Sequence, residues 1–495
     1  MIGLLLACSG PGTVGFPDDT SVVDSPVDTG DSPDDTGQPM TWTALPQGCE
    51  PADDLPQDPL NLEGSRKITQ EGPGQFFVEL LDVEHHGDRV YAVGQGGIIT
   101  YDVSDPTDIQ PLSVFPEEQA KDRYHKVEVL AEDIVAVTHP KRHLRIVDLS
   151  TKQDVFYLGE QGMEGLAQAG GRLYVSDRNV GLRVFDISDL ATVSEVTQVS
   201  GLANTWELAV TDDGWLYAAD AVLGLVPFDL SNPDAPVMGT PIAVEGSINH
   251  VRAVDDHVLV SNGSRGVAVF ERSDPSAPSL QSQLTTGGSV TQTDAADGVL
   301  WAADHESVTA WDFSDPNDPR PLHRETTEQF ALAVRAGPTV EGKATAFVGD
   351  WSILGYWTAD PSIQAPRLEL TTRDIYLWEE ERIVEVRNHG AVAGDLLGYT
   401  GQDLLVEASS TTVEPGGSAW LRITTTNPQE GATRLCIAAE DPQEPTRDHR
   451  VLQGDTEGRL GDPAPDFTLD DLDGTAWTLS ELQGKPVMIT YFATW

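Results

Sequence analysis

The nine residues Ile98–Pro106, IITYDVSDP, decide the fold of this protein. An apolar run leads into an aromatic residue, an acid, a serine and a proline, and this order returns along the chain. The later copies are LRIVDLS at 144–150, LRVFDISD at 182–189, LVPFDLSNP at 225–233, VAVFERSDP at 267–275, VTAWDFSDP at 308–316 and, degraded, LGYWTADP at 354–361. Seven copies spaced 38 to 46 residues apart identify an internal repeat.

A second apolar segment precedes each copy and alternates like a β-strand. These segments are RVYAVG at 89–94, DIVAVTH at 133–139, RLYVSD at 172–177, WLYAAD at 215–220, HVLVSN at 257–262, VLWAAD at 299–304 and ATAFVGD at 344–350. A third alternating segment comes earlier in the repeat, as in VEVLAED at 127–133. Three or four short strands in a unit of this size are typical of one propeller blade.

A single blade buries neither of its faces, whereas blades stacked around an axis bury both, and closing the ring leaves only short edges. We therefore expect a mostly β protein in which residues 61–364 form a seven-bladed β-propeller. Six or eight blades are the alternatives, because the first and last repeats are the least regular. The segment SRKITQEGPGQFFVEL, at 65–80, is expected to supply a strand that closes the last blade.

The repeated strands resemble the LVIVD repeat family, as in LRIVD at 144–148 followed by a serine turn. The resemblance spans residues 76–364. It implies a propeller of the kind found on bacterial and archaeal cell-surface proteins, and it implies no particular reaction.

Two columns of polar residues recur in the repeats, and for both we expect a structural role rather than cation binding. Oxygen atoms at such positions accept hydrogen bonds from the N–H groups of their own turns. The first column follows the aromatic residue and consists of Asp102, Asp148, Asp186, Asp229, Glu271 and Asp312. The second column ends the preceding strand and consists of His139, Asp177, Asp220, Asn262, Asp304 and Asp350.

Histidines gather on the first, second and fifth repeats: His85, His86, His125, His139, His143 and His250. Three convergent imidazoles would form a metal site, and His125 and His250 each enter a first strand near the expected central channel. Their irregular spacing favours separate structural roles, so we expect no metal site, no cofactor and no catalytic residue in the ring. A metal-dependent site on one face of residues 60–364 is the weaker alternative. No nucleophile elbow, phosphate loop or H-E-x-x-H motif is present.

Residues 365–455 lack the repeat and contain alternating segments of another kind: IVEVRN at 383–388, LLVEAS at 404–409, SAWLRITTT at 418–426 and TRLCIAAED at 433–441. They resemble the immunoglobulin-like β-sandwich modules of exported bacterial proteins, which act as spacers or adhesion units. Cys436 is expected to face the core of this module. A disulfide with Cys49 is one alternative, and a buried, unpaired thiol is the slightly favoured one.

The first eight residues, MIGLLLAC, resemble the end of a bacterial lipoprotein signal, which implies lipidation of Cys8. The apolar run is too short to span a bilayer, and no Lys or Arg occurs before Arg66, so the signal is expected to be incomplete. Residues 9–60 are rich in Asp, Ser, Thr, Pro and Gly and are expected to form a disordered acidic linker. The net charge of -50 disfavours a nucleic-acid partner.

Residues 456–495 contain GDPAPDF at 461–467, DLDG at 471–474, LSELQGKP at 479–486 and FATW at 492–495. In this order they resemble the opening of the redoxin branch of the thioredoxin fold, which includes the alkyl hydroperoxide reductase and thiol-specific antioxidant families. The resemblance implies an incomplete thioredoxin-like α/β segment. The residues that match the approach to the family's redox centre are Pro465, Asp466, Phe467, Phe492, Ala493, Thr494 and Trp495.

In the redoxin family a reactive Cys follows this tryptophan at once, at a helix N-terminus that lowers the pKa of its thiol. A sequence that stops at Trp495 has three explanations: a fragment, a truncating mutation, or a selenocysteine codon taken as a stop, which is the favoured one. Without that residue the chain is expected to be inactive in thiol chemistry.

Together these patterns predict an envelope protein held by a lipid anchor at a periplasmic or outer-membrane surface. With its reading frame completed it would be a thiol-disulfide oxidoreductase or a peroxidase. The alternative is a non-enzymatic surface lipoprotein that binds or scaffolds, with a protein partner on the propeller or on the sandwich.

Overall fold

The computed structural model describes residues 40–52, 55, 57–67, 79–115, 123–139, 141, 143–372, 374–377, 381–427, 431–442, 445–453, 468–470 and 476–478. This part of the chain is mostly β-strand, and its one helical element is a short 3-10 turn, Leu190–Thr192. None of the described residues belongs to a helix that is long and apolar enough to cross a membrane.

Five sheets of four antiparallel strands follow one another along the chain, and in each the strands pair in sequence order. The first two sheets contain β3 (Asp82–His86), β4 (Arg89–Gly94), β5 (Gly97–Asp102) and β6 (Gln110–Phe115), then β7 (Lys126–Ala131), β8 (Ile134–His139), β9 (His143–Asp148) and β10 (Gln153–Leu158). The third contains β11 (Met163–Ala169), β12 (Arg172–Asp177), β13 (Gly181–Asp186) and β14 (Ser194–Val199). The fourth and fifth contain β15 (Thr205–Val210), β16 (Trp215–Asp220), β17 (Gly224–Asp229) and β18 (Val237–Met238), then β19 (His250–Val254), β20 (His257–Ser261), β21 (Val267–Glu271) and β22 (Ser279–Leu284).

A larger sheet of seven strands completes the set and has the order β2-β28-β27-β26-β25-β24-β23. Its strands are β2 (Leu60–Lys67), β23 (Gln292–Ala296), β24 (Val299–Ala303), β25 (His305–Asp312), β26 (Arg320–Val340), β27 (Lys343–Asp350) and β28 (Ile353–Ala359). The long strand β26 belongs to two groups of four, because residues 320–326 pair with β25 and residues 331–340 pair mainly with β27. The other edge is β2, which arrives from the N-terminal side of the chain and pairs with β28.

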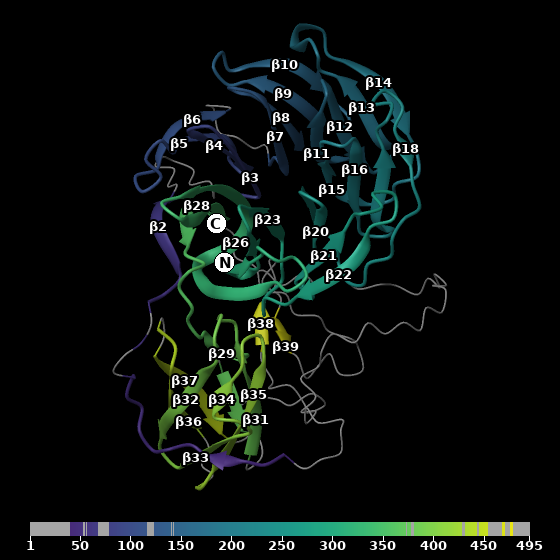
Figure 1. Ribbon diagram of the computed structural model, residues 1–495. Coiled ribbons are helices and arrows are strands. Elements are labelled where there is room, and N and C mark those ends of the chain that lie inside the picture. The colour runs from purple at the N-terminus through teal and green to yellow at the C-terminus, as the bar shows by residue number, and fades with distance from the viewer. Residues whose placement is uncertain are drawn as a thin grey trace.

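The sheets are arranged around a ring, as Figure 1 shows. The first strands of successive sheets contact one another in the order β3, β7, β11, β15, β19 and β23, and the second half of β26 returns to β3. The middle strands are buried on both faces, as in β12 and β13, whereas outer strands such as β14 are largely exposed. Small four-stranded sheets stacked in this way are compatible with the blades of a β-propeller.

The strand positions predicted from the repeats are confirmed, including the segment before each turn and the segment that contains the aromatic residue. The closing strand differs from the prediction: it runs over Leu60–Lys67, so only its last three residues coincide with the segment expected at 65–80. Register explains the difference, because Leu60 pairs with Ala359 and is buried in a core cluster with Trp357.

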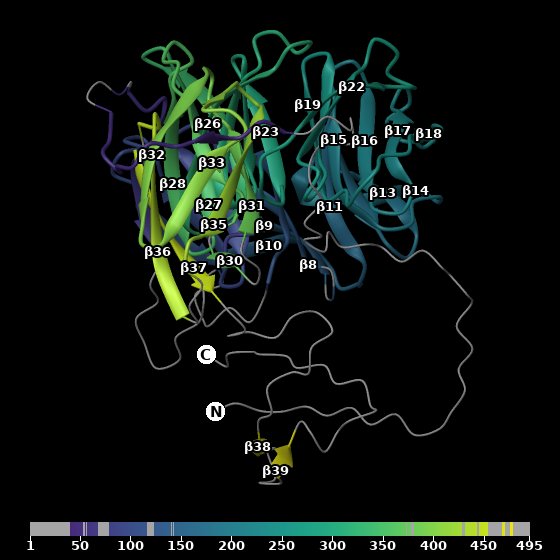
Figure 2. The same ribbon diagram turned by 90° about the horizontal axis from the view of Figure 1, so that it is seen from below.

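The second module consists of two five-stranded sheets around one apolar core. One sheet has the order β1 (Thr43–Ala44), β33 (Leu404–Ala408), β35 (Ser418–Thr425), β31 (Glu381–Asn388) and β29 (Leu368–Leu370). The other has the order β30 (Asp374–Leu377), β37 (Thr446–Gln453), β36 (Gly431–Ala439), β32 (Gly394–Gly401) and β34 (Thr412–Val413). Figure 2 shows this module beside one part of the ring. Strand β1 lies within the range expected to be a linker, and Leu45 beside it joins the module's core.

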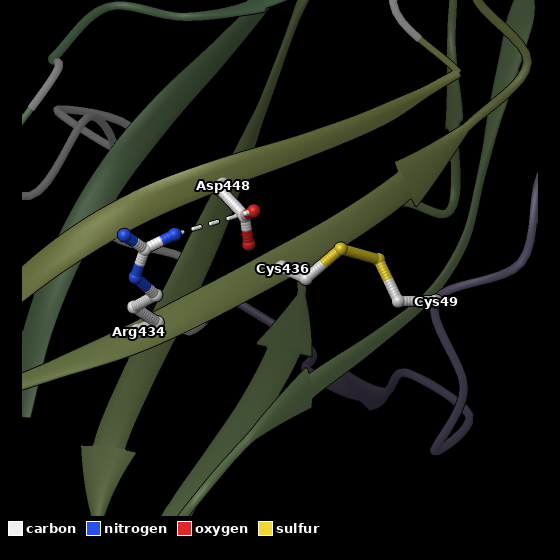
Figure 3. Close-up of a disulfide and its surroundings, with 4 residues drawn as sticks. All are labelled: Cys49, Arg434, Cys436 and Asp448. Atoms are coloured by element: carbon white, nitrogen blue, oxygen red, sulfur yellow. Dashed lines mark ion pairs between the residues drawn. A yellow bond between two sulfur atoms is a disulfide. The ribbon is translucent and has the colours of Figure 1, made fainter.

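A disulfide joins Cys49 to Cys436, with 6.1 Å between their Cα atoms (Figure 3). The favoured expectation of an unpaired, core-facing thiol at Cys436 is therefore wrong. On β36 the neighbouring Leu435 and Ile437 face the core, so the strand alternation turns Cys436 outward to the N-terminal segment.

Buried charges connect the ring to the second module. Arg324 on β26 forms an ion pair with Glu369 on β29, and its carbonyl accepts a hydrogen bond of 2.9 Å from Arg367 Nε. Arg367 in turn donates to Asp441 Oδ2 at 2.8 Å, and both side chains are almost completely buried. Each charge in this chain of contacts therefore has a partner, which offsets the cost of burying it.

Near the C-terminal end, β38 (Thr468–Asp470) and β39 (Ala476–Thr478) form an antiparallel pair. Both strands lie in residues 456–495, for which the resemblance implies a thioredoxin-like α/β segment. The seven residues of the redoxin-like motif and Cys8 lie outside the described residues.

Candidate functional site

Six inner strands of the ring line a polar cavity of about 380 Å³. Its charged lining consists of Glu128 on β7, Arg252 on β19, Asp294 on β23 and Arg335 on β26. Residues of β11 and β15, among them Gln168 and Leu208, complete the wall. A cavity of this size is within the range of small-molecule sites, and its charged groups converge from strands far apart in sequence.

Strand alternation explains why the charges face the same way. The first strands of four sheets place two polar residues at positions i and i+2, which point to one face of a strand. The four pairs are Asp82 and Glu84, Lys126 and Glu128, His250 and Arg252, and Gln292 and Asp294. A polar-x-polar pattern at the start of a repeat was therefore the sequence signal for this site, and our sequence analysis, directed at the strand ends, missed it.

Two arginines and two acids form a closed group of four charges, three of which line the cavity. Arg252 contacts Glu84 Oε1 at 3.2 Å and Asp294 Oδ1 at 3.3 Å. Arg335 contacts the same two acids, reaching Asp294 Oδ2 at 3.5 Å and pairing closely with Glu84. Each guanidinium thus bridges two carboxylates, which holds all four side chains in fixed positions.

Other inward polar side chains fasten neighbouring sheets together. Asp82 Oδ2 accepts from the backbone N–H of Val127 at 3.0 Å, and Gln292 Oε1 accepts from that of Val334 at 3.1 Å. Asp294 Oδ2 accepts from Ala336 N–H at 3.1 Å. The partners are 45, 42 and 42 residues apart, which is one repeat, so these side chains link each inner strand to the next.

Glu128 differs from the other acids because no ion pair of its own occurs among the described residues, although it lines the cavity. Burial raises the pKa of Glu128 well above its usual value, and the nearby charge of Glu84 adds to this. Burial likewise raises the pKa of Glu84 and of Asp294, with Arg252 opposing the shift in both. The cavity therefore offers one carboxyl group without an ion pair among the described residues, beside guanidinium groups that are already paired.

Lys126 and His250 complete the charged surroundings of the cavity. Lys126 forms a close ion pair with Glu207 on β15. Burial lowers the pKa of His250 well below its usual value, and the charges of Lys126 and Arg252 lower it further. His250 is consequently neutral at physiological pH.

The six histidines noted in the sequence take separate roles. His125 Nδ1 lies 3.1 Å from Glu164 Oε2, while the rings of His139 and His143 are tilted by 60° with their centroids 5.3 Å apart. His85 packs against Phe347, and burial lowers the pKa of its imidazole. Within the part of the chain that the structure describes, none of the six belongs to a group of three or more potential metal ligands.

The first column of polar residues has the predicted structural role, and the second column has it in part. In the first column the acid accepts from the N–H of the serine two residues on, at 2.9 Å for Asp102 and for Asp148. In the second, Asp220 accepts from the N–H groups of Ala203 and Val222. The remaining acids of the first column bond the same way, and Asp177 and Asp304 of the second accept from their own turns. Asp350 instead accepts from the N–H of Gln329, 21 residues away, and Asn262 donates to the carbonyl of Glu245.

Comparison with known proteins agrees with the repeat. Residues 165–200 match the family model described as the LVIVD repeat. No curated protein matches the chain. Among solved structures, the chain is similar to the computationally designed Ika8 protein, at 12% identity over 60% of this chain and 100% of that one, with a TM-score of 0.43. It is also similar to U3-55K, at 13% identity over 60% of this chain and 98% of that one, with a TM-score of 0.48.

Proposed function

We propose that this protein is a cell-envelope binding protein, built as a seven-bladed β-propeller with an immunoglobulin-like sandwich, that holds a small polar ligand in its central cavity. The observation that carries the proposal is the convergence of six inner strands on one cavity whose wall charges are fixed by ion pairs. Fixed polar groups favour binding, because little ordering is needed when the ligand arrives.

The chemistry of the lining indicates the class of ligand. Glu128 is the acid without an ion pair among the described residues, so it is the group that a ligand would engage. A carboxyl group favours an amine or a hydroxyl donor, and the net charge of -50 attracts cations to the molecule. We therefore propose a small amine or a polyhydroxy compound with a donor toward Glu128.

Binding can be tested by thermal shift and calorimetry with three probe sets: polyamines, amino acids and monosaccharides. One set is expected to raise the unfolding temperature of the full chain. Glu128→Gln should lose at least tenfold in affinity for the compound that binds. Glu132→Gln is the matched control, because Glu132 lies beyond the end of β7 and is exposed. Equal affinity in the Glu128→Gln variant and the wild type would contradict the proposal.

The envelope location rests on the disulfide. Disulfides persist in oxidising compartments outside the cytoplasm, and Cys49–Cys436 ties two distant parts of this chain. We propose that lipidation of Cys8 anchors the protein at a periplasmic or outer-membrane surface. Metabolic labelling with palmitate is expected to mark the wild type but not Cys8→Ala, and unlabelled wild type would exclude the anchor.

A second proposal is that the complete reading frame encodes a thiol-disulfide oxidoreductase or peroxidase of the redoxin type. It rests on the order of GDPAPDF at 461–467, DLDG at 471–474, LSELQGKP at 479–486 and FATW at 492–495, which resembles the opening of the redoxin family. Sequencing the DNA beyond the codon for Trp495 tests it. An in-frame continuation with the rest of a thioredoxin fold is expected, and the extended protein should reduce or oxidise a model dithiol. If the DNA beyond that codon is unrelated, the redoxin proposal is excluded and only the proposed binding function remains.

A further inference from the structure

A second group of potential ligands lies at the place where the ring closes. Asp58 precedes β2, and His323 and Glu325 lie on the first part of β26. One ligand atom from each of the three residues falls within 4.8 Å of the others. The group therefore joins the N-terminal segment to the outer strand of the preceding four-stranded group.

The spacing of these atoms suits a transition-metal ion. His323 Nε2 lies 3.3 Å from Asp58 Oδ1. In a tetrahedral zinc site with bonds of about 2.1 Å, neighbouring ligand atoms are about 3.4 Å apart. The imidazole and the first carboxylate are already at that separation, and an oxygen of the Glu325 carboxylate lies within 4.8 Å of both.

Charge and burial favour a cation here over a simple hydrogen bond. His323 is completely buried, and Asp58 and Glu325 are half-buried. A His–Asp pair needs only one carboxylate, whereas two carboxylates close together in a partly dry place repel each other unless a cation offsets them.

The nearest arginines form ion pairs with other acids. Arg324 pairs with Asp304 and Glu369, and Arg367 pairs with Asp441. The donor set of one imidazole nitrogen and two carboxylate oxygens is a zinc type, and three protein ligands leave a fourth position for water. A pocket of about 260 Å³, lined by both Asp58 and Glu325, adjoins that position.

We propose that Asp58, His323 and Glu325 bind one Zn²⁺ ion that clamps the closing strand β2 to β26. The ion would fix the start of β2, where Asp58 Oδ1 also accepts from Leu60 N–H at 2.9 Å. This site is separate from the central cavity, so the two can be tested independently.

The test uses the full chain without a histidine tag, stripped with EDTA and then titrated with Zn²⁺. Calorimetry and elemental analysis are expected to give one tightly bound zinc per chain. Asp58→Asn and Glu325→Gln should each lose at least tenfold in affinity. Glu328→Gln is the matched control, because Glu328 lines the same pocket and pairs with Lys67 but lies outside the ligand group, and it should bind like the wild type.

Unfolding temperature gives a second measurement. Zinc is expected to raise it for the wild type and for Glu328→Gln, but not for Asp58→Asn, whose transition in EDTA shows whether the variant is folded. The proposal is overturned if the wild type takes up no zinc, or if a folded Asp58→Asn variant retains wild-type affinity.

Discussion

One N-terminal segment completes both the second module and the ring, and it is held in two different ways. In the second module β1 pairs with β33 through only Thr43 and Ala44, and the covalent bond from Cys49 to Cys436 fixes the segment. In the ring β2 pairs with β28 from Leu60 to Lys67 and no covalent bond is involved. The short β1–β33 pairing is reinforced by a disulfide, whereas the longer β2–β28 pairing is held by backbone hydrogen bonds and by the packing of buried Leu60.

The largest effect on stability is expected when the disulfide is removed by the double substitution Cys49→Ser and Cys436→Ser. The folded ring pairs Leu60 with Ala359, so the disulfide closes an open loop of roughly 90 residues. Chain entropy assigns about 4 to 5 kcal/mol to a loop of that order. Hydrogen exchange should show faster opening of β33 and β36, with the ring unchanged.

The reducing agent dithiothreitol supplies the control for that experiment. It should destabilise the second module of the wild type and have no effect on the double serine variant. A uniform loss of protection over the ring as well would mean that the two regions do not close independently.

The next effect should appear in the ring with Leu60→Ala. Leu60 is 2% exposed and packs in the cluster that contains Trp357 and Leu322. Truncating such a leucine costs about 3 kcal/mol, because it removes apolar contacts and leaves a cavity. Denaturant unfolding should report this loss, and hydrogen exchange should locate it at β28.

Leu62→Ala is the matched control on the same strand, since Leu62 is 50% exposed. It should change stability by less than about 0.5 kcal/mol. Equal losses of stability in Leu60→Ala and Leu62→Ala would show that the hydrogen bonds between β2 and β28, rather than the burial of Leu60, hold the ring closed.

A smaller effect is expected from the repeated turns. In Asp148→Ala the turn loses the acceptor for the N–H groups of Ser150 and Thr151, worth about 0.5 to 1 kcal/mol. Asp148→Asn keeps an acceptor oxygen and should recover most of the loss in denaturant unfolding. A loss as large as that of Leu60→Ala would contradict the view that many similar turns share the stabilisation of the ring.

The last prediction concerns the slope of stability against pH rather than its size. The pKa of Glu128 is raised in the folded chain, so the folded state binds its proton more tightly than the unfolded state does. This contribution is fully present below the unfolded pKa and is lost as pH rises through the folded pKa. Glu128→Gln removes it. In urea unfolding, the free energy of unfolding of Glu128→Gln should therefore rise relative to that of the wild type as the pH goes from 4 to 8. If the difference between the two proteins stays constant over this range, the raised pKa of Glu128 is contradicted.

The architecture of the ring could largely be predicted from the chain, because each repeat carries its own strand alternation and turn residues. The acids of the IITYDVSDP copies bond turns two residues away, and such local contacts depend only on near neighbours. The candidate sites could not be predicted in the same way. Glu84, Arg252 and Asp294 lie in the first, fifth and sixth repeats, and only ring closure brings them together.

The amino-acid sequence by itself determined the repeat, the strands and the turn bonds, because these follow from residue spacing within about 40 positions. Tertiary structure alone decided which distant groups meet: Cys49 with Cys436, Leu60 with Ala359, and Asp58 with His323. The physical reason is that each of these contacts closes a long loop, and its partner is selected by the register and packing of the whole fold rather than by any local pattern.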